Sequence, residues 1–521
     1  MKKSLPFLII FVVLLTACSL LNTEEQTSVT LTDAGKSISV NTIPGVTVDQ
    51  LLNEQKIQLS PLDKVTPPLT TFLNGGELIV ITRISEEFSI VESVLPFEQQ
   101  TIKNESLSEG QTVLIQPGVN GRLQSTHRIL YEDGKEVSRT IVKEEIIQPP
   151  KPEILMIGVQ SPFSAVDITG VIAYISSSNA WVMDENTGNR KIVVSTGDLD
   201  GRIFSISFDR KWLLFSRSAE DTSGEKINSL WLVDITKDEP KLINTGIRDV
   251  VHYADWVPGR NRTFSYSTVE PRATAPGWQA NNDLHIYRFD VDGEKADDTV
   301  LVDSNSGGIY GWWGSTYQWS PDGTKLAYAR PDSIGIVNLK SGELESLIDF
   351  APYQPKTDWA WVPGIQWSAQ GSVLFTVVNN VENGAQTSDS YDLAAILIET
   401  KRVIPLVSRC GLFCYPTPSN TAGEQDYFIG FLSAILPDQS ENSRYALSIM
   451  DRDGSNRKKL YPGEGVRGLD PQLLSWSPAD EAGAAQWLAF MSQGNMMLVE
   501  IPSGTIKQVT GDGSISKIIW R

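Results

Sequence analysis

The segment Gln318–Arg330 constrains the fold most, because it reads as two short strands around a tight turn and recurs along the chain. The first strand ends at Trp319, and the second runs from Lys325 to Ala329. Between them, Pro321 presets φ and Gly323 accepts a positive φ, so the chain reverses. Related segments contain Phe208, Trp256, Trp367, Trp476 and Trp520 at the position of Trp319.

A repeat of this size predicts a β-propeller, in which each repeat forms one blade. Successive anchor residues are separated by 48, 63, 48, 109 and 44 residues. Because the gap of 109 is about twice the usual spacing, we expect it to contain a degenerate blade, with strands between Phe413 and Tyr461. We therefore predict a mainly β fold with about seven four-stranded blades, and six or eight are the alternatives.

The end of the chain predicts how the propeller closes. The sequence stops at Arg521, directly after an inner-strand signature that has no second strand behind it. Upstream, Val171–Ser176, Ala180–Asp184 and Lys191–Ser195 read as strands without an inner strand before them. Pairing the C-terminal strand with these strands would satisfy backbone groups on both sides, so we expect a closed propeller over residues 165–521.

These repeats resemble the TolB-type propeller family. Ser320–Tyr328 and Ile449–Leu460 lie close to the consensus of that family. The resemblance implies a fold and says little about function, because propellers host many activities.

The first residues are typical of a bacterial lipoprotein. Lys2 and Lys3 precede an apolar run, and Leu15-Thr-Ala-Cys18 matches a lipobox. We expect a signal peptide over residues 1–17, a lipidated Cys18 and a polar tether to residue 27. An uncleaved membrane anchor and an ordinary signal peptide are the alternatives. Export leaves Cys410 and Cys414 as an even pair, which we expect to form a disulfide.

Two small β-rich modules are expected between the tether and the propeller. The first, residues 28–83, resembles the ubiquitin-like domain that precedes five-glycine domains in bacterial cell-wall proteins, including resuscitation-promoting factors. The matching residues are Thr47–Leu52, Leu62–Val65, Gly75-Gly76 and Leu78–Arg83. Thr47 can cap a short helix over Val48–Gln55.

The second module, residues 84–158, resembles the elongated five-glycine domain itself. Its glycines would be Gly110, Gly118, Gly121, Gly134 and Gly158, each in or beside a turn between extended strands. Any one of these glycines alone is explained by an ordinary hairpin turn. The resemblance implies binding of N-acetylglucosamine-containing glycans such as peptidoglycan, and some family members act as adhesion spacers.

Charge and missing motifs exclude several function classes. The net charge of −19 disfavours nucleic acid as a partner. The sequence has no Gly-x-Ser-x-Gly nucleophile elbow and no His-Glu-x-x-His motif. The three histidines, at positions 127, 252 and 285, are interpreted as strand residues. We therefore predict no catalytic residue, no metal site and no cofactor.

One group of aromatic residues is a candidate binding patch. Trp312 and Trp313 precede one inner strand, while Trp359 and Trp361 precede the next. Loops in that position line one mouth of the channel, so the two pairs should be neighbours and could stack on sugars or hold a protein. Packing between blades is the alternative. The insertion Thr268–Asn282 is longer than an ordinary hairpin loop.

Together these features predict a non-enzymatic, extracytoplasmic lipoprotein anchored to a membrane. The five-glycine domain would bind cell-wall glycan, and the propeller would present a face to a ligand or a protein. One alternative is a propeller hydrolase or lyase that acts on glycans. The other is an assembly or sensory scaffold whose propeller binds only protein.

Overall fold

The computed structural model describes residues 26–104, 110, 112–159, 163–219, 226–353, 355, 358–379, 390–420 and 427–521. The predicted signal peptide and Cys18 lie outside these ranges. The described chain is nearly all β, with one α-helix and one short 3-10 helix, η1 (Pro437–Gln439). Neither of these helices has the length and apolar character needed to cross a membrane. The chain forms two compact units, residues 1–99 with 118–153 and residues 100–117 with 154–521.

The first unit begins with a small mixed sheet packed against a helix. The sheet has the order β2-β1-β4-β3, and β1 pairs in parallel with β4. Its elements are β1 (Thr27–Asp33), β2 (Lys36–Thr42), α1 (Val48–Glu54), β3 (Lys64–Thr66) and β4 (Leu78–Thr82). Thr47 and Gln50 form a capping box at the start of α1, which satisfies backbone N–H groups there. The core contains Leu31, Leu51 and Ile79, which are all buried.

The five-glycine region forms two three-stranded sheets, of which the first is antiparallel throughout. The first has the order β5-β8-β9 and consists of β5 (Ile84–Leu95), β8 (Gly121–Glu132) and β9 (Lys135–Gln148). The second has the order β6-β10-β7 and consists of β6 (Gln99–Asn104), β10 (Glu153–Gly158) and β7 (Thr112–Gln116). We call the second one the distal sheet. Its residues Ile102, Ile154 and Met156 share a hydrophobic core with Trp181 and Trp487 of the following region.

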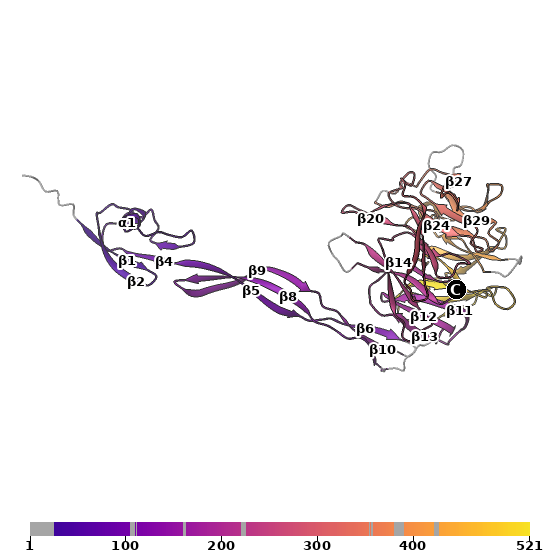
Figure 1. Cartoon of the computed structure of the whole chain (residues 1–521), viewed down its shortest axis with the longest axis horizontal. Helices are drawn as coiled ribbons and strands as arrows, with labels where there is room; N and C mark the ends of the chain where they lie inside the picture. Colours follow the sequence, from indigo (N-terminus) through magenta and orange to yellow (C-terminus); the bar gives the residue numbers. More distant parts are fainter. Residues whose placement is uncertain are drawn as a thin grey trace, which may run out of the picture. The chain divides into compact units, whose positions relative to one another are not determined.

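Residues 165–521 form seven four-stranded antiparallel sheets, which we call the seven-sheet body (Figure 1). Sheets 1 to 3 contain β13 (Arg190–Val194), β12 (Asn179–Asn186), β11 (Asp167–Ser176) and β40 (Ile515–Trp520); β14 (Leu199–Ile206), β15 (Trp212–Ser218), β16 (Asn228–Asp234) and β17 (Leu242–Arg248); and β18 (Ala254–Trp256), β19 (Thr263–Tyr266), β22 (Leu284–Phe289) and β23 (Lys295–Val302). A separate hairpin, β20 (Val269–Pro271) with β21 (Trp278–Ala280), is inserted between β19 and β22.

Sheets 4 to 7 follow in chain order without crossovers. They contain β24 (Thr316–Trp319), β25 (Leu326–Ala329), β26 (Ser333–Val337) and β27 (Leu344–Asp349); β28 (Ile365–Trp367), β29 (Val373–Asn379), β30 (Tyr391–Leu397) and β31 (Arg402–Val407); β32 (Thr417–Pro418), β33 (Phe428–Ala434), β34 (Tyr445–Asp451) and β35 (Lys458–Tyr461); and β36 (Ser475–Trp476), β37 (Trp487–Ser492), β38 (Asn495–Glu500) and β39 (Ile506–Gln508). Sheet 6 occupies the long gap in which a degenerate repeat was expected.

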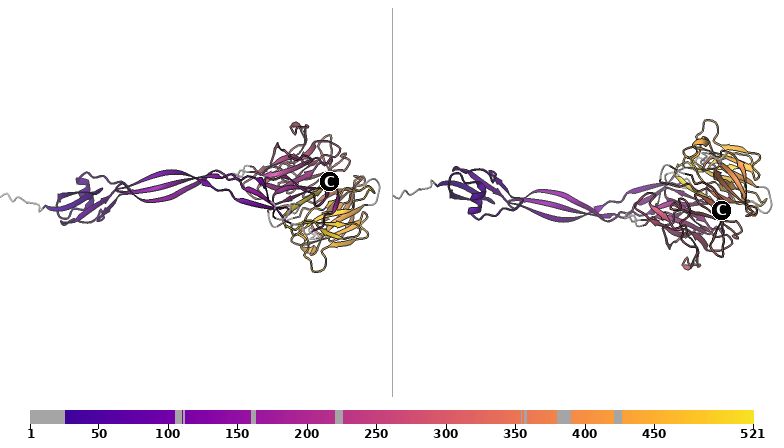
Figure 2. Two further views of the ribbon diagram at one scale, coloured as in Figure 1. Left: turned by 90° about the horizontal axis from the view of Figure 1, so that it is seen from below. Right: turned by 90° about the horizontal axis from the view of Figure 1, so that it is seen from above.

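The C-terminal strand pairs with the first sheet of the body. Strand β40 lies antiparallel to β11, with Ile172 opposite Trp520 and Tyr174 opposite Ile518. Both views in Figure 2 place the C-terminus where the magenta part of the body meets its yellow part. The pairing expected from the end of the sequence is therefore present.

Tryptophans at the repeat anchors connect neighbouring sheets. The indole N–H of Trp256 donates to the Ser205 carbonyl at 3.1 Å, and that of Trp367 donates to the Gln318 carbonyl at 2.9 Å. Trp319 and Trp476 likewise donate to Ser265 and Thr417 of the preceding sheets. Each buried indole thus satisfies its one donor on the sheet before it, which explains why the anchor recurs.

Candidate functional site

The predicted glycines of the five-glycine domain fall into two structural kinds. Gly110 and Gly134 have φ values of +79° and +77°, in the left-handed region that favours glycine. Gly118 and Gly121 have no such requirement and lie where another part of the chain leaves no room for a side chain. A Cβ on Gly118 would lie 2.4 Å from the Phe97 ring, and one on Gly121 would lie 2.4 Å from the Gln148 carbonyl oxygen. At Gly158, the carbonyl accepts the Gly110 N–H at 3.1 Å.

The β5-β8-β9 sheet exposes an unusual number of large apolar side chains. Phe88, Ile90 and Val94 on β5 are 57%, 64% and 66% exposed, and their spacing places them on one face. Arg128 lies opposite Phe88 and forms an ion pair with Glu86 at 2.6 Å. Apolar patches of this kind, interleaved with charges, mark interaction surfaces.

Strand β9 is interrupted at regular intervals. Its pairing with β8 skips Val137, Val142 and Ile147, so an extra residue enters the strand every five positions. Such bulges increase the local twist and disturb the free edge of a strand. The edge of β5 has no such interruption over its twelve paired residues. The sheet therefore has one protected edge and one regular edge.

Loops at one end of the seven sheets hold the predicted aromatic residues. Within each sheet, successive strands are antiparallel. The loop that leads to the next sheet therefore lies at the same end of the sheet as the loop between its second and third strands. We call this end of the body the loop face. It includes residues 249–253, 267–283, 303–315, 358–364 and 408–416.

Trp312 and Trp313 belong to an aromatic cluster that extends toward sheets 2 and 3. The ring of Trp313 lies 5.2 Å from Trp278 and 5.4 Å from His252. The indole N–H of Trp278 donates to the Trp313 carbonyl at 3.0 Å. The Arg202 guanidinium lies over the Trp278 ring at 5.1 Å, a cation–π arrangement. We call these five residues the tryptophan cluster.

Burial controls the charge of His252 in this cluster. Loss of hydration lowers the pKa of His252 to about 4, and the positive charge of Arg202 acts in the same direction. The imidazole is therefore neutral at physiological pH. The cluster presents aromatic faces and one guanidinium, which suits stacking on a sugar ring or on a planar side chain.

Trp359 and Trp361 belong to a different cluster, directed toward sheet 6. Trp361 is only 3% exposed, and its indole N–H donates to the Leu412 carbonyl at 3.1 Å. Trp359 is half-buried, with its ring 6.3 Å from Phe413 and 5.8 Å from Tyr353. The prediction of one accessible patch is therefore wrong for Trp361, because its loop packs against the next sheet and not toward Trp312.

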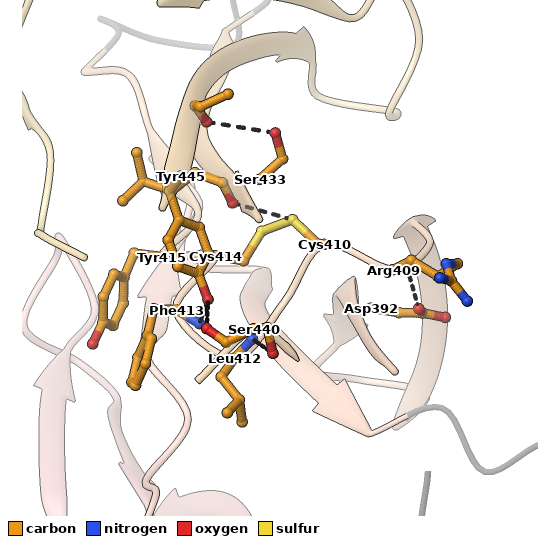
Figure 3. Close-up of a disulfide and its surroundings, with 12 residues drawn as sticks. Asp392, Arg409, Cys410, Leu412, Phe413, Cys414, Tyr415, Ser433, Ser440 and Tyr445 are labelled. Atoms are coloured by element: carbon orange, nitrogen blue, oxygen red, sulfur yellow. Dashed lines mark hydrogen bonds between the residues drawn. A yellow bond between two sulfur atoms is a disulfide. The ribbon is translucent and has the colours of Figure 1, made fainter. Parts of the chain in front are cut away.

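A disulfide holds the loop on which Phe413 lies, as the sequence predicted. Cys410 and Cys414 are joined, and both are buried (Figure 3). The Tyr445 hydroxyl donates to the Ser440 carbonyl at 2.7 Å and accepts the Phe413 N–H at 3.3 Å. The short loop is therefore fixed by covalent and polar contacts on both sides.

A cluster of titratable residues lies at the base of the inserted hairpin, and the sequence analysis missed it. Nε2 of His285 lies 3.2 Å from a carboxylate oxygen of Asp283, and Nδ1 lies 3.8 Å from Asp298. The Tyr266 ring stacks on His285 at 4.8 Å and its hydroxyl donates to Asp298 at 3.1 Å. The only signal was the pattern Asp-x-His directly after the long insertion, since Asp298 and Tyr266 come from other strands.

A groove of about 520 Å³ adjoins this cluster between sheets 2 and 3. Its lining includes Tyr266, Asp298, Lys295, Arg248 and Thr268. Among the described residues, no group of three or more His, Cys, Asp or Glu side chains is arranged to hold a metal ion. The groove is lined by positively charged, negatively charged and aromatic side chains.

Two segments match known domain families. Residues 86–160 match the G5 domain, and residues 29–70 match the G5-linked ubiquitin-like domain. The first unit and the distal sheet thus contain the two modules that the sequence resembles.

Relatives share this part of the chain. YabE of Bacillus subtilis (strain 168), a candidate cell wall shaping protein, is 33% identical over 180 residues, which is 34% of this chain and 43% of that relative. The resuscitation-promoting factor RpfB of Mycolicibacterium smegmatis is 25% identical over 167 residues, or 31% of this chain and 45% of that one. This chain thus spans less than half the length of either relative.

A solved structure also resembles part of the chain. A periplasmic gluconolactonase of Pseudomonas aeruginosa is 12% identical, with a TM-score of 0.43 over 68% of this chain and 98% of that one. At this level the similarity carries no conclusion about activity.

Proposed function

We propose that this protein is a non-enzymatic cell-envelope lipoprotein that binds N-acetylglucosamine-type wall glycan and presents a β-propeller to a partner. The observation that carries the proposal is the pair of matched domains, G5 and ubiquitin-like, in a region similar to proteins named for cell wall shaping and resuscitation. Four of the five glycines in the resemblance occupy positions where a side chain would be strained, at Gly110 and Gly134, or would collide, at Gly118 and Gly121.

The glycan surface in this proposal is the face of the β5-β8-β9 sheet that bears Phe88, Ile90 and Val94. The apolar side chains would cover the faces of sugar rings, since carbohydrate faces are weakly apolar. Arg128 and Arg122, which lie beside them in pairs with Glu86 and Glu92, would donate to hydroxyl and acetamide oxygens. The single-layer sheet leaves this face open to an extended polymer.

The body, in this proposal, is a closed seven-bladed propeller. Contacts from β40 to both neighbouring sheets support closure. The backbone N–H of Trp520 donates to the Ser475 hydroxyl of sheet 7 at 2.8 Å. The Lys517 ammonium donates to the Gly201 carbonyl of sheet 2 at 2.7 Å. The Arg521 guanidinium also donates to the Ile206 carbonyl of sheet 2 at 2.6 Å.

The loop face would be the partner-binding platform, with the tryptophan cluster at its centre. Loops on a rigid scaffold are where binding residues concentrate. Attachment through Cys18 would keep the protein outside the cytoplasm and on a membrane, within reach of the wall. The proposal includes no turnover of the glycan.

Co-sedimentation with purified peptidoglycan tests the proposal. The test protein is residues 19–521, which lacks Cys18, and the variant carries both Phe88→Ser and Ile90→Ser. We expect wild type to sediment with the wall and the variant to lose most of its binding, about tenfold or more for two buried contacts. A matched control, Val291→Ser, alters an exposed apolar residue of the body that is 70% exposed and should bind like wild type.

Two results would contradict the proposal. One is a wild-type protein that stays in the supernatant, or a variant that sediments as well as wild type. The other is release of soluble reducing ends during the incubation, which would favour the hydrolase alternative. Release of unsaturated ends would favour a lyase.

A further inference from the structure

The hairpin β20–β21 joins the body through a narrow neck of polar residues. The neck consists of Ser267, Thr268, Asn281 and Asp283. The Asn281 backbone N–H donates to the Thr268 carbonyl at 3.1 Å, and its side-chain amide donates to the Thr268 hydroxyl at 2.8 Å. The two ends of the insertion are therefore held together by hydrogen bonds and not by a continuous sheet.

Asp283 is the central acceptor of the neck. Its carboxylate accepts the Thr268 N–H at 2.7 Å, the Thr268 hydroxyl at 2.5 Å and the Ser267 hydroxyl at 3.2 Å. The residue is 4% exposed. Burial raises the pKa of Asp283, but the hydrogen bonds from His285 and Thr268 outweigh it and hold that pKa below its usual value. The neck therefore depends on a buried negative charge.

His285 is the group that compensates this charge. It faces two carboxylates, Asp283 before the strand and Asp298 on β23, and the Tyr266 ring from β19 covers its plane. Lys295 lies behind Asp298 at 3.4 Å, and Arg248 and Asp249 of the β17 end line the adjoining groove. The hydrogen bond to Asp283 raises the pKa of His285, partial burial opposes the rise, and the charge of Asp298 adds to it.

The two ring nitrogens respond differently to loss of the proton. A neutral imidazole can still donate from Nε2 to Asp283. In the neutral ring, the Nδ1 lone pair would face the Asp298 carboxylate at 3.8 Å. In the protonated ring, Nδ1 carries a proton and the contact is attractive. Deprotonation therefore leaves a buried carboxylate with a weaker partner and adds a repulsion.

We propose that the His285–Asp283–Asp298 cluster is a pH-sensitive clamp that holds the inserted hairpin on the loop face and opens when His285 loses its proton. The direction of the pH dependence follows from the raised pKa of His285. The stabilisation is complete below about pH 6.5, the ordinary value for histidine, and is lost as the pH rises through the raised value. Acidic surroundings therefore keep the hairpin closed.

The clamp would regulate the tryptophan cluster, so this part of the inference depends on the function proposed for the loop face. The hairpin places Trp278 against Trp313, and the Ala280 N–H donates to the Trp312 carbonyl at 3.0 Å. Val269 and Ala280 pack on Val251 in a small core. Release of the neck would separate Trp278 from its partners and open the aromatic surface.

Hydrogen–deuterium exchange of the whole protein, without any ligand, tests the clamp directly. Protection factors of peptides covering residues 268–282 are compared with those of residues 326–337 in sheet 4, between pH 5.5 and 9. We expect protection of the hairpin to fall about tenfold for each unit by which the pKa of His285 exceeds its ordinary value, while sheet 4 does not change. His252 stays neutral throughout this range and does not contribute.

Two variants complete the test. His285→Gln keeps an amide donor near Asp283 but cannot titrate, so its hairpin should show low protection and no pH step. Asp298→Asn removes one carboxylate and should move the step to lower pH. Constant wild-type protection, or an unchanged step in either variant, would overturn the clamp. Because no glycan or partner is present, these results do not depend on whether the protein binds the wall.

Discussion

Single glycines in the five-glycine domain show how residue identity fixes local structure. Gly134 turns the chain between β8 and β9 with a positive φ, and open space surrounds it. Gly121 has an ordinary backbone conformation, but the Gln148 carbonyl and the Pro150 nitrogen lie where a side chain would begin. The sequence predicted both positions as turns, because spacing alone does not distinguish a strained φ from a close backbone approach.

The residue Gly121 therefore gives a sharp test of close packing. In Gly121→Ala, the added Cβ would lie 2.4 Å and 2.6 Å from two backbone atoms that cannot rotate away. We expect the first unit to lose about 1–3 kcal/mol of stability, as for overpacked cores. Urea unfolding of the whole chain, followed by hydrogen exchange in residues 121–148, measures the loss. Gly463→Ala, where nothing lies within 4 Å, should behave as wild type; equal stability of both variants would contradict this explanation.

At the scale of elements, the sequence predicted strands and their pairing far better than it predicted loops. Trp256, Trp319 and Trp367 recur because each donates to the sheet before it, and this constraint is visible as a spaced repeat. Loop packing has no such periodic signal. Trp312 and Trp361 precede neighbouring sheets but have different partners. The Trp312 carbonyl accepts the Ala280 N–H of the inserted hairpin, while the Trp361 indole donates to Leu412 of the disulfide loop.

The His285 cluster was missed for a related reason. Its partners Tyr266 and Asp298 lie on the strands on either side of β22, so no short motif contains them. Only strand register brings these three side chains together. Sequence patterns recover contacts that repeat, whereas a charge cluster formed once from three strands leaves no pattern.

The disulfide loop provides a prediction at this scale. Replacing Cys410 and Cys414 by Ser frees a five-residue loop, which by loop entropy costs about 2 kcal/mol. We expect the body of the variant to unfold at a lower denaturant concentration. Tryptophan fluorescence reports on the body, because every tryptophan lies at or after Trp181. The ubiquitin-like core, which contains neither cysteine, should unfold as before. A body that unfolds at the wild-type denaturant concentration would show that the Tyr445 and Trp361 contacts suffice to hold the loop.

At the scale of the whole molecule, the compact units do not divide at the end of the G5 match. The division falls inside the five-glycine region, and the distal sheet belongs with the seven-sheet body. Ile102, Ile154 and Met156 are each less than 5% exposed because they pack with Trp181 and Trp487. A fragment that stops at Gly158 would therefore expose an apolar surface that the intact chain buries.

This division predicts that a residue of the five-glycine domain stabilises the body. Ile154→Asp would place a charge in a fully buried site and remove its packing, so we expect a loss of about 3–5 kcal/mol in the stability of the body. Leu114→Asp changes a residue of the same sheet that is 53% exposed and should cost less than about 1 kcal/mol. Tryptophan fluorescence during urea unfolding compares the two, because no tryptophan precedes position 181. If Ile154→Asp leaves that transition unchanged, the distal sheet is independent of the body; if it shifts the transition and Leu114→Asp does not, the distal sheet and the body are held by a shared core.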